Sequence, residues 1–164
     1  MGLTDRSTAV PAWVERLKQE KELLQAKTAA AAERDRADRL QVESDGPKFW
    51  NAFVKELQNQ SPHLIDLGIR ASATVMGATA GVAEAICHVE MASTALHPQI
   101  TNANFFYGKG QTEIRSVGMM RTPSFRFQIF PQGLKAVSDD SSFPMDAEQA
   151  AEVVLERMAT HVTR

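Results

Sequence analysis

The chain has 164 residues, 43% of them hydrophobic, and a formal net charge of -2 at pH 7. This length suits one globular domain with an appended element better than two full domains. The 18 basic and 20 acidic residues leave no basic excess. We therefore expect no binding to nucleic acid and none to an acidic membrane surface.

The sequence also predicts a cytoplasmic protein. Cys87 is the single cysteine, so no internal disulfide can form, which is typical of a reducing compartment. The opening MGLTDRSTAVPAWVERLKQ carries charges and lacks the apolar core of a signal peptide. No window approaches the ~18 uninterrupted apolar residues of a membrane-spanning helix.

Residues 1–45 are predicted to form a protruding, highly charged helix, helical over about 8–43. Its apolar side chains recur at helical spacing in one stripe, formed by Val10, Trp13, Val14, Leu17 and Leu24. The sequence then changes to AAAAERDRADRLQ, which favours a helix but offers little to bury. We expect the stripe to bind a protein partner or a second copy of the chain.

A long coiled coil is not favoured for this helix. One apolar row recurs every seven residues, at Val10, Leu17, Leu24 and Ala31. The companion positions are charged, at Glu20, Lys27 and Arg34. A short helical contact, or docking onto the sheet of a neighbour, fits better, with Trp13 as the natural anchor.

Residues 46–164 are predicted to form an α+β globular domain. The segment SDGP at 44–47 is expected to end the first helix and start a short aromatic helix. That helix has a broad apolar face, formed by Phe49, Trp50, Phe53, Val54 and Leu57. Its expected role is packing on a sheet. The alternative is that Phe49, Trp50 and Phe53 line a ligand pocket between helix and sheet.

The hydrophobic period changes to two between Leu64 and about Pro131, which predicts an antiparallel sheet of four to five strands. The first two strands would be joined at the turn MGATAG, and a second pair would flank the turn YGKGQ. SFRFQIF supplies a further strand. A final helix opens with a capping box formed by Asp146 and Gln149, and should cover part of the sheet.

Chemical motifs are sparse. His88 and Glu90 share a strand face and could act as a general base or contribute to a metal site. Only two ligands converge there, and the other histidines lack metal-site spacing, so we predict no metal and no cofactor. Cys87 and His88 cannot form a dyad, because neighbours on a strand project to opposite faces. No catalytic residue is nominated beyond the candidates His88 and Glu90.

These patterns favour a non-catalytic protein-interaction or assembly module, with the N-terminal helix as contact element. The alternative is a small-molecule-binding protein or a simple acid–base enzyme. Its pocket would lie between the aromatic helix and the sheet.

Overall fold

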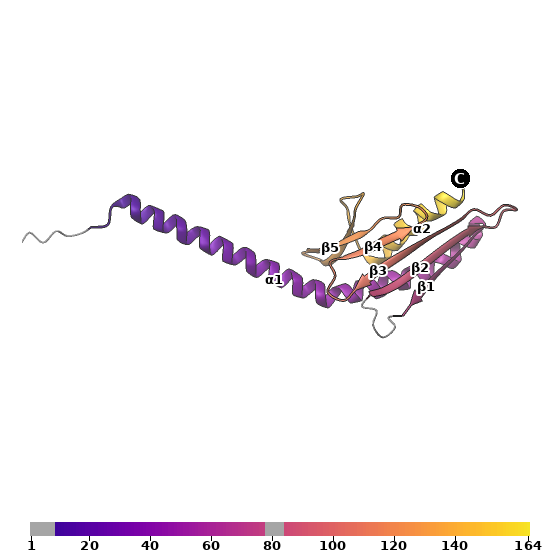
Figure 1. Ribbon diagram of the computed structural model, residues 1–164, viewed down its shortest axis with the longest axis horizontal. Helices are drawn as coiled ribbons and strands as arrows, with labels where there is room; N and C mark the ends of the chain where they lie inside the picture. Colours follow the sequence, from indigo (N-terminus) through magenta and orange to yellow (C-terminus); the bar gives the residue numbers. More distant parts are fainter. Residues whose placement is uncertain (1–8, 78–83) are drawn as a thin grey trace, which may run out of the picture. The chain divides into compact units, whose positions relative to one another are not determined.

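The structure is a computed structural model that describes residues 9–77 and 84–164. Contacts divide the chain into two compact units, Met1–Asp38 and Arg39–Arg164. The elements, in chain order, are α1 (Ala12–Gln60), the 3-10 helix η1 (Ser61–Leu67), β1 (Ile69–Met76), β2 (Glu84–Ser93), β3 (Ile100–Gly108), β4 (Glu113–Gly118), β5 (Phe125–Phe130), β6 (Gly133–Ser138), β7 (Pro144–Met145) and α2 (Ala147–Val162) (Figure 1). The fold is α+β, as the sequence predicts.

The predicted break at residues 44–47 is wrong, because α1 runs without interruption from Ala12 to Gln60 and contains no separate aromatic helix. Gly46 is buried within this helix, where a Cβ atom would lie 2.5 Å from the hydroxyl oxygen of Tyr107. Pro47 lacks an amide hydrogen and so removes one helical hydrogen bond. Packing on both sides of this pair outweighs the local preference, since Val42 and Phe49 are both buried.

In the described part of the chain, the sheet has seven strands rather than four to five, all antiparallel and in sequence order from β1 to β7. The sequence analysis missed β6 and the two-residue β7. Phe130 pairs with Gly133, so Pro131 and Gln132 form a tight turn. Gly133 has φ +115°, a conformation that favours glycine. This turn brings Gly133–Ser138, to which no strand was assigned from the sequence, into pairing with β5.

The first strand also begins later than predicted. Ser61–Leu67 forms η1 with Pro62 in its first turn, and β1 starts only at Ile69. Gly68, with φ +70°, separates the two elements. The predicted turn MGATAG falls mostly within residues 78–83, outside the described residues.

The strand register separates a core face from an outer face. On the core face, Val75 pairs with Cys87, which pairs in turn with Phe105. On the outer face, Thr74 pairs with His88, and His88 with Asn104.

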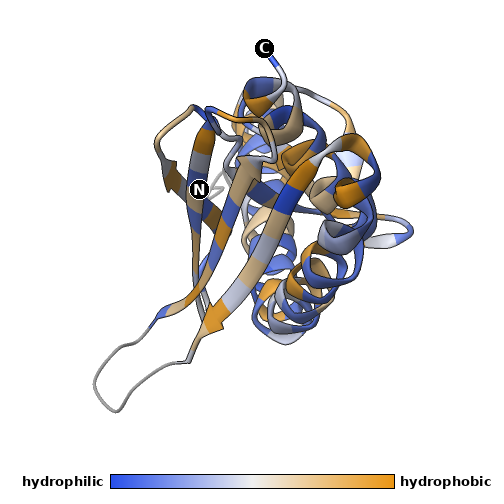
Figure 2. Cartoon of the chain, turned by 90° about the vertical axis from the view of Figure 1, so that its right-hand side faces the viewer, coloured by the Kyte–Doolittle hydropathy of each residue, from blue (hydrophilic) through white to orange (hydrophobic). Residues whose placement is uncertain are grey.

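The hydrophobic core lies between the sheet and the helices, with α2 and the C-terminal part of α1 on one side of the sheet (Figure 2). Its largest fully buried side chains include Phe53, Phe105, Phe125 and Met158. The capping box of α2 is confirmed. The Asp146 carboxylate accepts a hydrogen bond from the Gln149 backbone N–H, and the Gln149 side-chain oxygen accepts one from the Asp146 backbone N–H. Within residues 9–77 and 84–164, no helix combines the length and apolar character needed to cross a membrane.

Candidate functional site

The stripe formed by Val10, Trp13, Val14, Leu17 and Leu24, here called the N-terminal stripe, lies largely in solvent. Trp13 is 59% exposed and Leu24 is 66% exposed, whereas Val14 is half-buried. Leu23 is also exposed and was not singled out from the sequence, because it lies outside the row of stripe residues. Val10 precedes α1, and the other stripe residues place apolar side chains on the surface of this helix.

The charged residues at helical spacing from the N-terminal stripe are mainly basic, and Glu15 and Glu22 lie between them on the same segment. Charged residues three or four positions after a stripe residue are neighbours on the helix surface. They are Arg16, Lys18, Glu20, Lys21 and Lys27, four basic and one acidic. Lys18 lies 3.6 Å from Glu15, an exposed pair that contributes little to stability.

His88 and Glu90 lie on the outer face of β2. The Nδ1 atom of His88 is hydrogen-bonded to the Oδ1 atom of Asn104 at 2.7 Å, and its Nε2 atom lies 3.9 Å from a Glu90 carboxylate oxygen. Their side chains are 30% and 56% exposed, respectively. The sequence analysis missed Asn104, since only the β2–β3 register places it beside His88. Neither His88 nor Glu90 lines either of the two pockets described below.

Another polar cluster lies on the same outer face. Glu84 accepts hydrogen bonds from the Gln111 amide at 2.7 Å and from the Arg115 guanidinium at 2.8 and 3.0 Å. These bonds lower the pKa of the Glu84 carboxyl. The Arg115 guanidinium also stacks 5.5 Å from the centre of the Phe106 ring. All of these groups are mutually paired, as in a structural surface network.

Cys87 is fully buried on the opposite face of β2. Burial raises the pKa of its thiol to about 11, so the thiol stays protonated at neutral pH. A buried, protonated thiol is a poor nucleophile.

The aromatic residues Phe49, Trp50 and Phe53 lie in the core. Their rings are buried and face rings of the sheet, in the pairs Phe49–Phe127 at 5.2 Å, Trp50–Tyr107 at 5.6 Å, Phe53–Phe105 at 5.5 Å and Phe53–Phe125 at 5.7 Å. Such distances are those of packed aromatic pairs. None of the three residues lines either of the pockets described below.

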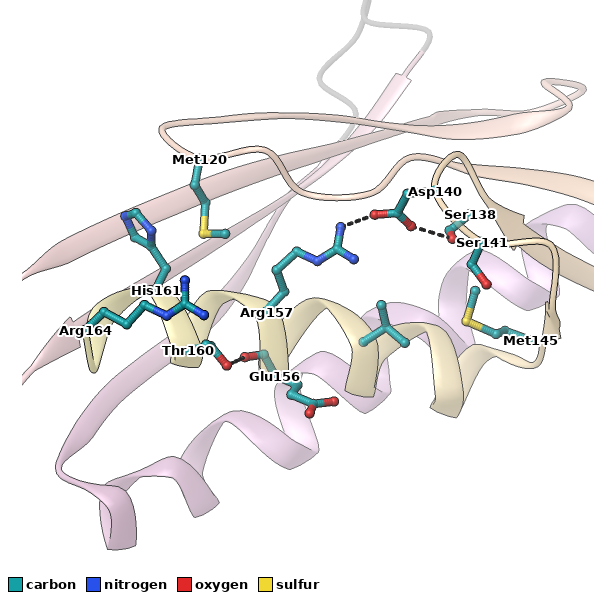
Figure 3. A pocket seen from close by; sticks show the side chains of 11 residues that line it. Met120, Ser138, Asp140, Ser141, Met145, Glu156, Arg157, Thr160, His161 and Arg164 are labelled. Atoms are coloured by element: carbon teal, nitrogen blue, oxygen red, sulfur yellow. Dashed lines mark hydrogen bonds and ion pairs between the residues drawn. The ribbon is translucent and has the colours of Figure 1, made fainter.

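A polar pocket of about 610 Å³ lies beside α2 and the loop between β6 and β7 (Figure 3). Arg157 forms an ion pair with Asp140, which also accepts a hydrogen bond from the Ser138 hydroxyl at 2.9 Å. The Arg157 guanidinium holds the pKa of the Asp140 carboxyl below its usual range. The other charged lining residues are Glu156 and Arg164, so acidic and basic side chains balance and leave no field that would select an ion.

A second pocket of about 590 Å³, here called the η1–α2 groove, is mainly apolar. Its apolar lining residues are Leu64, Leu67, Ile69, Leu155 and Ala159. Its polar and ionisable lining residues are Gln60, His63, Glu152, Glu156, Thr160 and Thr163. This groove was not predicted from the sequence, because the alternating pattern placed Leu64 and Leu67 in a strand. Pro62 was the signal that a helical turn begins there.

In the described residues, no group of three or more metal-ligating side chains is arranged to hold a metal ion. No family model, curated protein or solved structure matches the chain.

Proposed function

We propose that this chain is a non-catalytic protein-interaction or assembly module whose N-terminal helix is the contact element. The observation that carries the proposal is the exposure of the N-terminal stripe, with Trp13 59% and Leu17 52% exposed. Contiguous apolar side chains on a surface are typical of a protein-binding site. Tryptophan is also enriched among residues that dominate binding energy.

The energetics agree with a binding role. Burying one large apolar side chain contributes roughly 1.5–3 kcal/mol. A helix gains most of its stability by packing an amphipathic face, and the described residues before Val42 include no buried side chain. A partner that covers Trp13, Leu17 and Leu24 would therefore also stabilise the helix.

The alternative, a small-molecule pocket under the aromatic part of α1, has less support. Phe49, Trp50 and Phe53 occupy the space between helix and sheet with ring-to-ring contacts. His88 and Glu90 lie on the outer face, away from this layer. A general base works best in a pocket that holds its substrate within hydrogen-bond reach.

The test compares three full-length chains: the natural sequence, the double variant Trp13→Ala/Leu17→Ala, and the control Gln19→Ala/Glu22→Ala. The control changes exposed residues outside the stripe on the same helix. Each chain is used to capture proteins from a lysate of the source organism. The molar mass of each purified chain in solution is measured by light scattering. We expect a partner, or a mass above that of a monomer, for the natural chain and the control only. Identical captured proteins and identical masses for all three chains would refute the proposal.

A further inference from the structure

Within the described residues, two of the exposed apolar surfaces could meet in an assembly. One is the N-terminal stripe and the other is the η1–α2 groove. We propose that the groove is the docking site for the N-terminal stripe of a second copy of this chain. This inference rests on the proposed function and names the partner of the same contact element.

The floor of the groove suits an apolar helix. Its buried apolar residues are Ile69 on β1 and Leu155 and Ala159 on α2. Leu67 on η1 is 68% exposed at the margin of the groove. Ile65 on the same 3-10 helix is 54% exposed. A docked helix would cover Leu67, which otherwise faces water.

The spacing of the stripe matches this mode of binding. Amphipathic helices that enter hydrophobic grooves present anchors at positions i, i+3, i+4 and i+7. Within α1, Trp13 and Leu17 lie four residues apart and Leu17 and Leu24 seven apart, while Val10 precedes the helix. Trp13 is the largest of them and would enter the groove as the central anchor.

Charge complementarity selects this occupant. Every charged side chain in the lining of the groove is acidic, namely Glu152 and Glu156, which lie four residues apart on α2. His63 is the other titratable group of the lining, and Gln60 is neutral. The charged residues three or four positions after a stripe residue are four basic residues and one acidic residue. Opposite charges at the rim steer association and set its orientation.

Such a contact joins two different surfaces of the chain. The number of copies in the assembly therefore depends on whether the contacts close into a ring. Two copies that exchange helices reciprocally form a closed dimer containing two equal contacts. One-way docking would instead produce open chains of copies. We propose the reciprocal dimer, because two linked contacts bind more tightly than one.

A charge-reversal experiment tests the docking. The first variant carries Glu152→Lys/Glu156→Lys, the second carries Lys18→Glu/Lys21→Glu, and the third combines all four changes. The control carries Glu90→Lys/Glu148→Lys, which reverses two exposed charges outside the groove. Dimerisation of the full chain is measured by sedimentation over a range of concentrations.

We expect the first two variants to dimerise about tenfold more weakly or worse, because each brings like charges together at the contact. The third variant should recover association, and the control should match the natural chain. A full chain that is monomeric at all concentrations, or a third variant that fails to recover, would overturn the inference. If the docking inference fails but a different protein binds to the stripe, the proposed function is still supported.

Disulfide trapping identifies the contact directly. Cys87 is buried, so Lys21→Cys and Glu152→Cys each add one accessible thiol to a separate chain. Mixing the two variants under mild oxidation should give a mixed disulfide dimer, and mixing Lys21→Cys with Ser72→Cys should not. A disulfide that forms only between two Lys21→Cys chains would refute docking in the η1–α2 groove. It would show that the N-terminal helices pair with each other.

Discussion

At the scale of single residues, the contact between Gly46 and Tyr107 explains why α1 continues through a glycine and a proline. A Cβ atom on residue 46 would lie 2.5 Å from the Tyr107 hydroxyl oxygen, but 3.4 Å from Phe127 and 3.5 Å from the Tyr107 ring carbon that bears the hydroxyl. The hydroxyl is buried and makes no hydrogen bond to the described residues. Burial also raises the pKa of Tyr107. Glycine therefore makes room for one polar atom.

This contact predicts a strong coupling between two substitutions. Gly46→Ala alone should destabilise the protein by about 1–3 kcal/mol, because the Tyr107 ring is held against Trp50 and cannot move away. Tyr107→Phe should stabilise it by about 1 kcal/mol, since an unpaired buried hydroxyl is removed. In the Tyr107→Phe background, Gly46→Ala should become stabilising by up to about 1 kcal/mol. Urea unfolding of the four chains measures the cycle, and additive effects would contradict the explanation.

At the scale of elements, short-range caps and one ion pair connect the C-terminal helix to the sheet. Asp146 begins α2 with its capping box, and Arg157 joins α2 to Asp140 in the loop between β6 and β7. The Asp140 carboxylate is also held by the Ser138 hydroxyl. The pair therefore holds the loop against the helix at the polar pocket.

The lowered pKa of Asp140 predicts a dependence of stability on pH. A carboxyl whose pKa is depressed by folding stabilises the native state above its unfolded pKa of about 3.9. This contribution is lost as pH falls through the lowered folded value. Asp140→Asn should therefore reduce the unfolding free energy by about 0.5–1 kcal/mol near neutral pH. The difference from the natural chain should vanish in strong acid.

Urea unfolding at several pH values measures this effect. The neighbouring Asp139→Asn is the matched control, because it removes the same charge from an exposed side chain. An Asp140→Asn difference that persists unchanged in acid would show that the ion pair is not its cause.

At the scale of the whole molecule, the two compact units differ in how many of their side chains are buried. Within the described residues of Met1–Asp38, all side chains are exposed except the half-buried Val14. Of the residues that the structure describes, all of the buried hydrophobic side chains belong to the unit Arg39–Arg164. Its stability should therefore be independent of the first unit.

Deletion of residues 1–38 tests this independence. The remaining chain should unfold cooperatively with a free energy within about 0.5 kcal/mol of the full-length monomer, because no buried apolar area is removed. Comparison at low protein concentration is needed, since the proposed association would stabilise the full chain by mass action. Chemical unfolding monitored by tryptophan fluorescence reports the core through Trp50. A large loss of stability would show that the first unit supports the core.

Much of this organisation could be predicted from local pattern. Spacings of three and four residues correctly predicted helix for both α1 and α2, and alternation predicted the strands that contain Cys87 and Phe127. The capping box was visible because its two residues are three apart. Asn104 beside His88 was not visible, since 16 residues separate them and only strand pairing brings them together.

The sequence by itself determined the α+β class, the exposed apolar stripe and the balance of charge, because these depend on residues that are close along the chain. Only the tertiary structure decided that α1 passes through Gly46 and Pro47, that the sheet has seven strands, and that a groove lies between η1 and α2. Each of these depends on contacts between distant segments. There, burial of apolar side chains contributes more free energy than the local preferences of a glycine, a proline or a short turn.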